Sequence, residues 1–194
     1  MAAQLRRGSC RIIGGKWRGR KISFNDAEGL RPTTDRIRET VFNWLQFYVP
    51  QSRCLDCFAG SGILGFEALS RGAAEVIFIE NNSKTVKSIK DNIRLLGTDR
   101  AQIQHSDALD WLASVNMNKY FDLVFLDPPF NSDLLTKSSA LLDNCGCLAE
   151  DAIIYVEHAA EADVVLPDNW TCFKQKTSGQ VSYKLFENRV PGSH

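Results

Sequence analysis

The sequence Asp56-Cys57-Phe58-Ala59-Gly60-Ser61-Gly62-Ile63-Leu64-Gly65 decides the fold. It joins a predicted strand over residues 53–58 to a predicted helix over residues 62–71. Glycines let the backbone turn tightly and approach a ligand, and the first turn of the following helix offers free N–H groups. A strand, a glycine-rich turn and a helix in this order are typical of the first unit of a nucleotide-binding α/β sheet.

Strands and helices alternate on both sides of this unit. A helix over residues 35–48 precedes it. After it we expect strands at 76–80, 103–107, 120–127 and 153–157, with helices at 83–96, 108–114 and 132–142 between them. Segments 171–176 and 181–187 surround Ser178-Gly179 and predict a terminal hairpin. The alternation predicts an α/β protein with a Rossmann-like, mostly parallel seven-stranded sheet and one antiparallel edge strand.

A second motif, Asp127-Pro128-Pro129-Phe130, ends the predicted strand at 120–127. Two prolines lack the N–H groups that a sheet needs, and Pro128 favours an extended Asp127. The carboxyl end of a strand in an open α/β sheet is where ligands bind. Asp127 and the Pro128 carbonyl can accept hydrogen bonds from a planar NH2 group while Phe130 stacks on its face. For the motif alone, a proline turn after a strand is the alternative.

Acidic residues stand at the ends of four predicted strands: Asp56, Glu80, Asp107 and Asp127. Gly60–Gly65 matches the dinucleotide fingerprint, and Glu80, 20 residues after Gly60, is placed to bind ribose hydroxyls, so an NAD site is one interpretation. Asp56 argues against it, because a carboxylate beside a pyrophosphate is repelled. A cationic amine, such as that of S-adenosylmethionine, suits Asp56 better, and Asp107 can accept from an adenine amine.

The N-terminal part of the chain is basic. The whole chain holds 23 basic and 23 acidic residues, but residues 1–40 carry a net charge of +6 and the remainder −6. Strands at 11–13 and 20–24 with a Gly14-Gly15 turn predict a hairpin. Its cations and Trp17 suit phosphates and an unpaired base. A solvated hairpin whose Trp17 packs on the body is the alternative. We expect residues 1–33 to form an RNA-contacting extension and residues 34–194 the catalytic domain.

Composition excludes several classes of protein. A chain of 194 residues suits one domain with an appendage. The chain contains no run of 18 apolar residues, so no membrane span is predicted. The N-terminus also lacks the apolar core of an export signal, and we therefore expect a cytoplasmic protein. Cys54 and Cys57 have the spacing of a zinc or redox pair, but they lie in a strand pattern. Buried free cysteines are the favoured interpretation.

Taken together, the motifs resemble a known family. Asp56-x-Phe58-x-Gly60-x-Gly62, Glu80, Asp107 and Asp127–Phe130 resemble class I S-adenosylmethionine-dependent methyltransferases that act on exocyclic amines. A more specific resemblance lies in the leader, Arg11-Ile-Ile-Gly-Gly-x-x-Arg-Gly-Arg20 followed by Arg31-Pro-Thr-Thr-Asp-Arg-x-Arg-Glu39. It is similar to the bacterial family that methylates guanine N2 in 16S rRNA of the small ribosomal subunit, and the likeness spans roughly residues 11–187.

The resemblance implies roles for particular residues. The cofactor would be S-adenosylmethionine, bound by Asp56, Phe58, Gly60, Gly62, Glu80, Asp107 and Ala108. The target guanine would be held by Asp127, Pro128 and Phe130. The RNA would be contacted by Arg11, Lys16, Trp17, Arg18, Arg20, Arg31, Arg36 and Arg38. No metal is expected. The expected partner is 16S rRNA within the assembled or assembling small subunit, and the expected state is a monomer.

Three other functions stay open from the sequence. Methylation of adenine N6 in DNA or RNA is the main alternative, because an Asp-Pro-Pro-Phe motif suits any planar amine. An NAD-dependent oxidoreductase follows from Gly60–Gly65 with Glu80 and predicts NAD binding without S-adenosylmethionine binding. A non-enzymatic RNA-binding module follows from the basic leader alone and predicts that Asp127 is dispensable.

Overall fold

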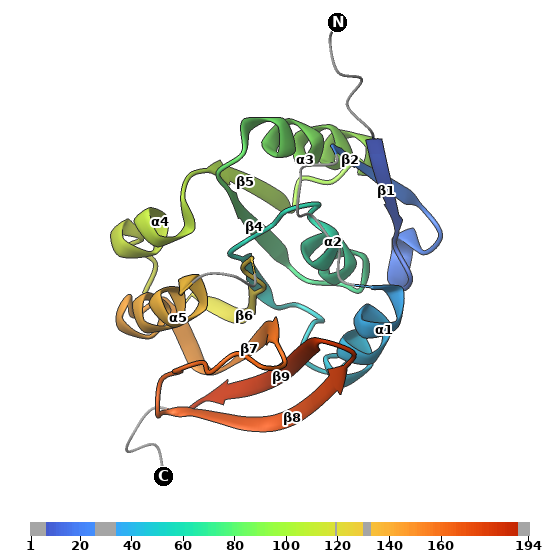
Figure 1. Cartoon of the computed structure of the whole chain (residues 1–194). Helices are drawn as coiled ribbons and strands as arrows, with labels where there is room; N and C mark the ends of the chain where they lie inside the picture. The colour runs from blue at the N-terminus through green and yellow to red at the C-terminus, as the bar shows by residue number, and fades with distance from the viewer. Residues whose placement is uncertain (1–6, 26–33, 119, 130–132, 190–194) are drawn as a thin grey trace, which may run out of the picture.

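A computed structural model describes residues 7–25, 34–118, 120–129 and 133–189 of the chain. Figure 1 shows a central sheet covered by helices on both faces, with a separate two-stranded hairpin beside helices α1, α2 and α3. The sheet has seven strands in the order β5-β4-β3-β6-β7-β9-β8. Their bounds are β3 Arg53–Asp56, β4 Glu75–Glu80, β5 Ala101–His105, β6 Phe121–Leu126, β7 Leu148–Ala159, β8 Trp170–Ser178 and β9 Val181–Asn188.

The directions of the strands confirm the predicted fold class. Strands β3 to β7 run parallel to one another. Strand β9 is antiparallel to both β7 and β8, between which it lies. The terminal hairpin therefore supplies the antiparallel part of an otherwise parallel sheet. Parallel strands joined by helices bring all their carboxyl ends to one edge of the sheet.

Two hydrophobic cores lie on opposite faces of the sheet. Helices α1 (Asp35–Trp44), α2 (Ile63–Ser70) and α3 (Ser83–Leu96) enclose one core together with the hairpin. Helices α4 (Ala108–Ser114) and α5 (Leu134–Asn144) enclose the other. Because both faces are covered, strands such as β6, Phe-Asp-Leu-Val-Phe-Leu, are apolar along most of their length. Within the described ranges, no helix has the length and apolar character needed to cross a membrane.

The helices begin and end at residues that satisfy the free N–H and C=O groups of their terminal turns. Asn82 accepts from the N–H groups of Lys84 and Thr85 at the start of α3, and Gly97 ends that helix with a φ of 63°. The predicted helices over 83–96 and 108–114 are confirmed at both ends. The helix predicted over 35–48 is shorter, because α1 ends at Trp44 and the chain then turns through hydrogen bonds from Tyr48 and Val49 to the Leu45 carbonyl.

The hairpin has a different register from the predicted one. Its strands are β1 (Arg7–Arg11) and β2 (Lys21–Asn25), and the short helix η1 (Gly15–Trp17) lies in the connection between them. Gly15 has a φ of +71°, and a Cβ on it would lie 1.9 Å from the Ser70 carbonyl oxygen. The predicted two-residue Gly14-Gly15 turn is therefore wrong. Gly15 serves a close approach of the connection to helix α2.

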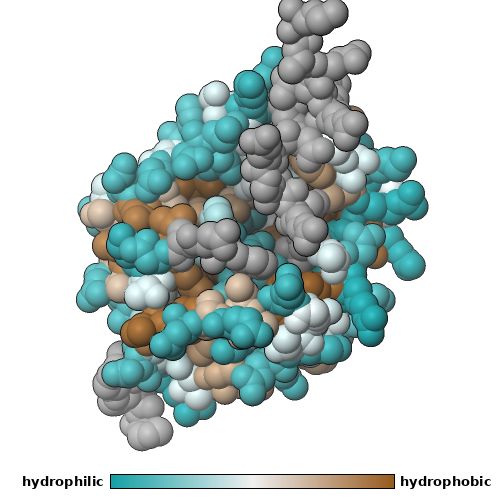
Figure 2. Space-filling model, in the orientation of Figure 1, coloured by the Kyte–Doolittle hydropathy of each residue, from teal (hydrophilic) through white to brown (hydrophobic). Residues whose placement is uncertain are grey.

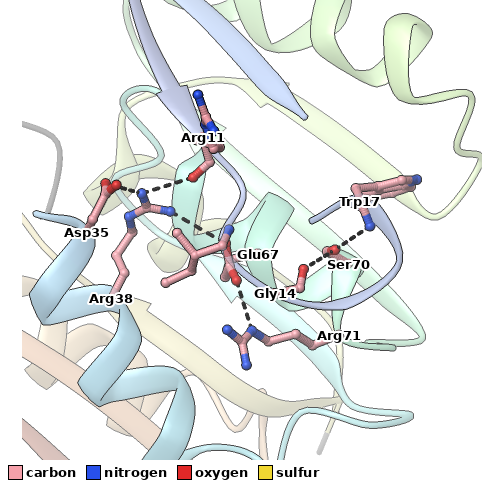
Figure 3. Close-up of polar contacts among 9 residues, drawn as sticks. Arg11, Gly14, Trp17, Asp35, Arg38, Glu67, Ser70 and Arg71 are labelled. Carbon is pink, nitrogen blue, oxygen red and sulfur yellow. Dashed lines mark hydrogen bonds and ion pairs between the residues drawn. The ribbon is translucent and has the colours of Figure 1, made fainter. Parts of the chain in front are cut away.

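A buried ion-pair network fastens the hairpin to the domain (Figure 3). The Arg38 side chain is 0% exposed and donates to Asp35 Oδ1 at 2.6 Å, to Glu67 Oε2 at 3.4 Å and to the Arg11 carbonyl at 3.0 Å. Glu67, also 0% exposed, accepts from the Ile13 N–H at 2.9 Å and from Arg71 Nε at 2.9 Å. Hairpin, α1 and α2 thus share one pair of buried charges.

A second contact strengthens the same junction. Ser70 Oγ accepts from the Trp17 N–H at 2.8 Å and donates to the Gly14 carbonyl at 2.6 Å. The Trp17 side chain is 4% exposed and belongs to the core that α1, α2 and α3 enclose. Hydrogen bonds from its backbone and apolar packing of Trp17 therefore both hold the hairpin connection against the domain.

Cys54 of β3 and Cys57, which follows that strand, are core residues, as the favoured interpretation expected, whereas Cys172 of β8 is exposed. Cys54 and Cys57 are 0% and 1% exposed and belong to different cores, on opposite faces of the sheet. Burial raises the pKa of the Cys54 thiol to about 12, which keeps it protonated. Cys145 and Cys147, which follow α5, are joined by a disulfide that the sequence analysis did not predict.

Replacing Arg38 tests the network. Arg38→Ala leaves the buried Glu67 carboxylate without one of its cations, so we expect the free energy of unfolding to fall by about 3–5 kcal/mol. Urea unfolding followed by circular dichroism measures the change. Arg36→Ala is the control, because Arg36 is exposed on the same helix, and its expected effect is below about 0.5 kcal/mol. Equal effects of the two substitutions would contradict the role of the network.

Candidate active site

The order of the strands reverses between β3 and β6, and at such a reversal open α/β sheets form a ligand-binding crevice at their carboxyl edge. The chain proceeds from β3 to β4 and β5 on one side and then returns to β6 on the other side of β3. Asp56 ends β3 and pairs with Phe125 of β6, and the Cys57 N–H donates to the Phe125 carbonyl at 3.1 Å. Such a reversal of strand order is where open α/β sheets bind ligands. Asp56 and Asp127 stand on its two sides.

The glycine-rich turn lies at this crevice in the conformation that its sequence predicts. Gly60 and Gly62 have φ angles of +50° and +77°, in the left-handed region that favours glycine, and Gly62 is the N-cap of α2. A Cβ on Gly65 would lie 2.2 Å from the Phe78 ring. The first two glycines thus shape the turn, and the third lets α2 pack closely against β4.

Glu80 holds the glycine turn against the end of β4. Its Oε2 accepts from the Gly60 N–H at 3.0 Å, and its Oε1 accepts from the Asn82 N–H at 2.7 Å. The Ala59 N–H also donates to the Ile79 carbonyl at 3.0 Å. The carboxylate therefore stands beside the turn, where binding of ribose hydroxyls stays a prediction.

Asp56 is a buried acid. It is 2% exposed, and its Oδ2 accepts from the Gly65 N–H at 3.2 Å. Burial raises the pKa of Asp56 to about 7; the Gly65 hydrogen bond lowers it and the charge of Glu80 raises it further. A cation bound beside this carboxyl would stabilise its charged form. Its proposed contact with a cofactor amine stays a prediction.

Asp107 and Ala108 lie at the neighbouring strand end. Asp107 Oδ1 accepts from the N–H groups of Leu109 and Asp110 at 2.8 and 3.3 Å and so caps α4. Ala108 is buried, and the half-buried Phe58 packs against the core on the same face. The structure brings Asp107 and Ala108 to the carboxyl edge of the sheet beside Glu80. Their contact with adenine stays a prediction.

The Asp127 motif follows β6 at the other side of the crevice. Asp127 is half-buried, Pro128 is buried and Pro129 is exposed, whereas Phe130 lies outside the described residues. The charge of Asp127 acts on the Tyr155 hydroxyl: burial raises the pKa of Tyr155 well above its usual value, and the charges of Glu157 and then Asp127 raise it further. Asp127 therefore lies near residues of β7.

Sequence reasoning missed the part of the site that β7 contributes. A pocket of about 30 Å³ is lined by Pro128, Pro129, Leu135, Glu157, His158, Ala162 and Val164. Glu157 stood at the end of a predicted strand, as the four acids of the prediction did, and this position was the signal that could have found it. Tyr155 and His158 gave no such signal, since a buried tyrosine and a lone histidine are common in cores.

The predicted RNA contacts separate into two groups. Arg11, Lys16, Arg18, Arg20 and Arg36 are exposed, and Arg20 also donates to the Leu95 carbonyl at 2.8 Å. The prediction for Arg38 and Trp17 is wrong, because both side chains are buried, one in the ion-pair network and one in a core. Arg31 lies outside the described residues. Figure 2 shows hydrophilic residues along the outer edge of the molecule on the side where the hairpin lies.

The charges of the crevice indicate the kind of ligand it accepts. Asp56, Glu80, Asp107 and Asp127 line successive strand ends, and the first of these is a buried acid with a raised pKa. A pyrophosphate would be repelled here, whereas the ammonium and sulfonium groups of S-adenosylmethionine fit. The fold and this crevice define the class of protein, the class I S-adenosylmethionine-dependent methyltransferases.

Comparison with known proteins identifies the family. The profile of a family described as "Conserved hypothetical protein 95" matches residues 10–187. Ribosomal RNA small subunit methyltransferase D of Haemophilus influenzae is 46% identical over 94% of this chain and 95% of that relative. Its namesake in Escherichia coli K12 is 45% identical over 95% and 93%. A putative methyltransferase structure from Escherichia coli has a TM-score of 0.87 at 43% identity, covering 94% of this chain and 99% of that chain. The chain belongs to this family of ribosomal RNA small subunit methyltransferases.

The pKa of Asp56 predicts a pH dependence of cofactor binding. With a folded pKa of about 7, the carboxyl is protonated at lower pH and charged at higher pH. If the charged form binds the amine of S-adenosylmethionine, affinity is lost as the pH falls, by about tenfold between pH 7 and 5.5. Both pH values lie below about 7.7, the pKa of an α-amino group, so the amine of the cofactor stays mostly charged at both.

Titration calorimetry at the two pH values measures this loss, with Asp56→Asn as the control. An asparagine does not titrate, so the affinity of this variant is expected to change little with pH. The same pH dependence in both proteins would show that Asp56 does not pair with the amine.

Proposed function

We propose that this protein transfers the methyl group of S-adenosylmethionine to the exocyclic N2 of a guanine in 16S rRNA of the small ribosomal subunit. Membership of a family whose relatives are named ribosomal RNA small subunit methyltransferases supports the reaction class. The observation that carries the assignment to an amine is the position of Asp127 and Pro128, directly across the β3–β6 crevice from Asp56 and the glycine turn.

In this proposal the strand ends divide between cofactor and base. Gly60 and Gly62 hold the methionine part of S-adenosylmethionine, with Asp56 beside its amine. Glu80 binds the ribose, and Asp107 with Ala108 binds adenine. Bound there, the cofactor supplies a methyl group already activated by its sulfonium. The protein's own contribution is to place acceptor groups and to orient the two reactants.

Asp127 and the Pro128 carbonyl would make the guanine N2 amine a better nucleophile. The lone pair of a guanine N2 amine is delocalised into the ring, so the amine is a poor nucleophile. Hydrogen bonds from its two N–H groups to these acceptors favour a more tetrahedral nitrogen, whose lone pair points at the methyl group. Fixed acceptors cost no reorganisation during the reaction, which is why such groups contribute strongly to rates.

The RNA reaches this site with its target base turned out of the helical stack. The exposed cations of the hairpin and α1, namely Arg11, Lys16, Arg18, Arg20 and Arg36, neutralise phosphates around the base. This surface is too small to recognise an RNA sequence by itself. We therefore propose that a cytoplasmic monomer recognises the guanine within the assembled or assembling subunit, where neighbouring RNA presents it.

Asp127→Ala tests the assigned reaction. We expect the methylation rate to fall by at least ~10²-fold, because an aligned polar group is removed from the reacting centre. Affinity for S-adenosylmethionine should change little. The assay uses tritiated S-adenosylmethionine with small subunits from cells that lack the protein, followed by nucleoside analysis. Asp99→Ala, an exposed acid just before β5 at the opposite edge of the sheet, is the control.

Label in N2-methylguanosine with the wild-type protein supports the proposal. Label in N6-methyladenosine would show that the substrate base is adenine and not guanine. Near-normal turnover by Asp127→Ala would contradict the role of this carboxylate, and comparison of naked rRNA with subunits tests the proposed form of the substrate.

Replacing both Arg18 and Arg20 by alanine tests the basic surface. If both cations neutralise phosphates, RNA affinity falls and the slope of log K against log salt becomes shallower by about 1.4–1.8. Filter binding over a range of salt concentrations measures the slope. Replacing the exposed Lys174 and Lys176 of β8 by alanine is the charge-matched control at the far edge of the sheet. An unchanged slope in the Arg18 and Arg20 variant would remove the hairpin from the RNA interface.

A further inference from the structure

Helix α3 carries a row of exposed cations that the proposed site does not use. Lys84, Lys87, Lys90 and Arg94 are exposed, and Asp91 is the only acid of this helix. The cations follow one another at intervals of three or four residues, which places them on one side of the helix. At about 1.5 Å per residue the row is about 15 Å long. Of the other helices in the described part of the chain, none carries more than one exposed lysine or arginine.

The positions of these cations do not stabilise the helix itself. The free N–H groups at a helix N-terminus favour acids and disfavour cations, yet the first turn of α3 contains Lys84 and no acid. Lys87 lies three residues from both Lys84 and Lys90, and like charges at this spacing repel each other. Arg94 pairs with Asp91 at 3.0 Å, but an exposed pair of this kind contributes little. A bound polyanion would relieve the repulsion along the row.

Helix α3 connects the proposed cofactor crevice with the hairpin. It begins shortly after Glu80, which holds the glycine turn. Farther along, Asn92 accepts from the Ser23 N–H of β2 at 3.1 Å and donates to the Ser23 carbonyl at 2.8 Å. Arg20 of the hairpin donates to the Leu95 carbonyl at 2.8 Å. Figure 1 shows α3 and β2 side by side. The cations of α3 therefore continue the basic surface of the hairpin towards the crevice.

The exposed side of α3 suits phosphates better than bases. The helix contains no aromatic residue, whereas proteins that hold unpaired bases use aromatic rings on which the bases stack. Lysine ammonium groups act as mobile point charges that neutralise phosphates. Phosphate contacts fix the position of a nucleic acid without reading its sequence. We therefore expect α3 to contribute affinity and orientation, and no base preference.

We propose that α3 and the hairpin form one continuous surface for the phosphate backbone of the rRNA beside the target base, in which Lys87 and Lys90 neutralise phosphates. The inference rests on the proposed function and adds a surface that the sequence analysis did not include. Charge complementarity and continuity with the exposed cations of the hairpin support RNA as the occupant. A solvated helix face without a partner is the alternative that the experiment tests.

The test replaces Lys87 and Lys90 together by alanine. In filter binding to 16S rRNA, the slope of log K against log salt should become shallower by about 1.4–1.8, because two phosphate contacts are lost. On small subunits from cells that lack the protein, kcat/KM should fall by at least ~5-fold through a higher KM. The maximal rate and the affinity for S-adenosylmethionine should not change. The Lys174 and Lys176 double alanine variant of β8 is again the charge-matched control.

Two further measurements separate RNA binding from folding. Replacing Lys87 and Lys90 by arginine keeps both charges, so this variant should keep the wild-type slope. Because the two lysines repel each other and alanine favours helices, the alanine variant should unfold at a temperature no lower than that of the wild type. An alanine variant with the wild-type salt slope would overturn the inference, and so would an arginine variant that loses the slope.

A combined variant tests whether the surface is continuous. If α3 and the hairpin bind one RNA at the same time, alanines at Lys87, Lys90, Arg18 and Arg20 should reduce the slope by about 2.8–3.6, the sum of the two pairs. A combined variant no shallower than either pair would contradict a shared surface. A wild-type protein that forms no N2-methylguanosine would defeat the proposed function, whereas methylation with an unchanged slope and KM in the Lys87 and Lys90 alanine variant would overturn this inference alone.

Discussion

The buried carboxylate of Glu67 is the interaction on which the arrangement of the molecule depends. It lies on α2, the helix that begins at the glycine turn, and it binds Arg38 of α1 and the Ile13 N–H of the hairpin connection. Buried charges are costly unless they are paired and hydrogen-bonded, so these three segments form one unit. The exposed cations of the hairpin are therefore held at a defined place relative to the cofactor crevice.

Electrostatics at the other end of α2 decide which ligands the crevice accepts. Asp56 is buried behind the glycine turn and has a raised pKa, and Glu80 holds the same turn through the Gly60 N–H. This arrangement keeps the glycine geometry of a dinucleotide site but opposes a pyrophosphate. In the proposed site the same backbone motif holds a cationic cofactor, because the charge of a few side chains selects the ligand while the glycines select only the turn.

Much of the fold could be predicted because its signals are local. Apolar runs, capping residues such as Asn82 and the glycine turn each determine the conformation of their own neighbourhood, and helices α3 and α4 were predicted to the residue. The hairpin was predicted in the wrong register because the conformation of Gly15 depends on its close approach to the Ser70 carbonyl, which is distant in sequence. The burial of Trp17 was only an alternative interpretation, because an aromatic residue among basic residues and glycines also suits an RNA surface. The burial of Arg38 was missed, because its partners Arg11 and Glu67 are distant in sequence.

The sequence by itself determined the alternation of strands and helices, the glycine turn, and the acids and prolines at the strand ends, because each depends on residues adjacent along the chain. Only the tertiary structure decided which of these ends meet. It placed Asp127 beside Tyr155 and Glu157 of β7 and turned Arg38 inward to Glu67. Pairing between strands and burial between layers join residues far apart in the chain, and no local pattern specifies them.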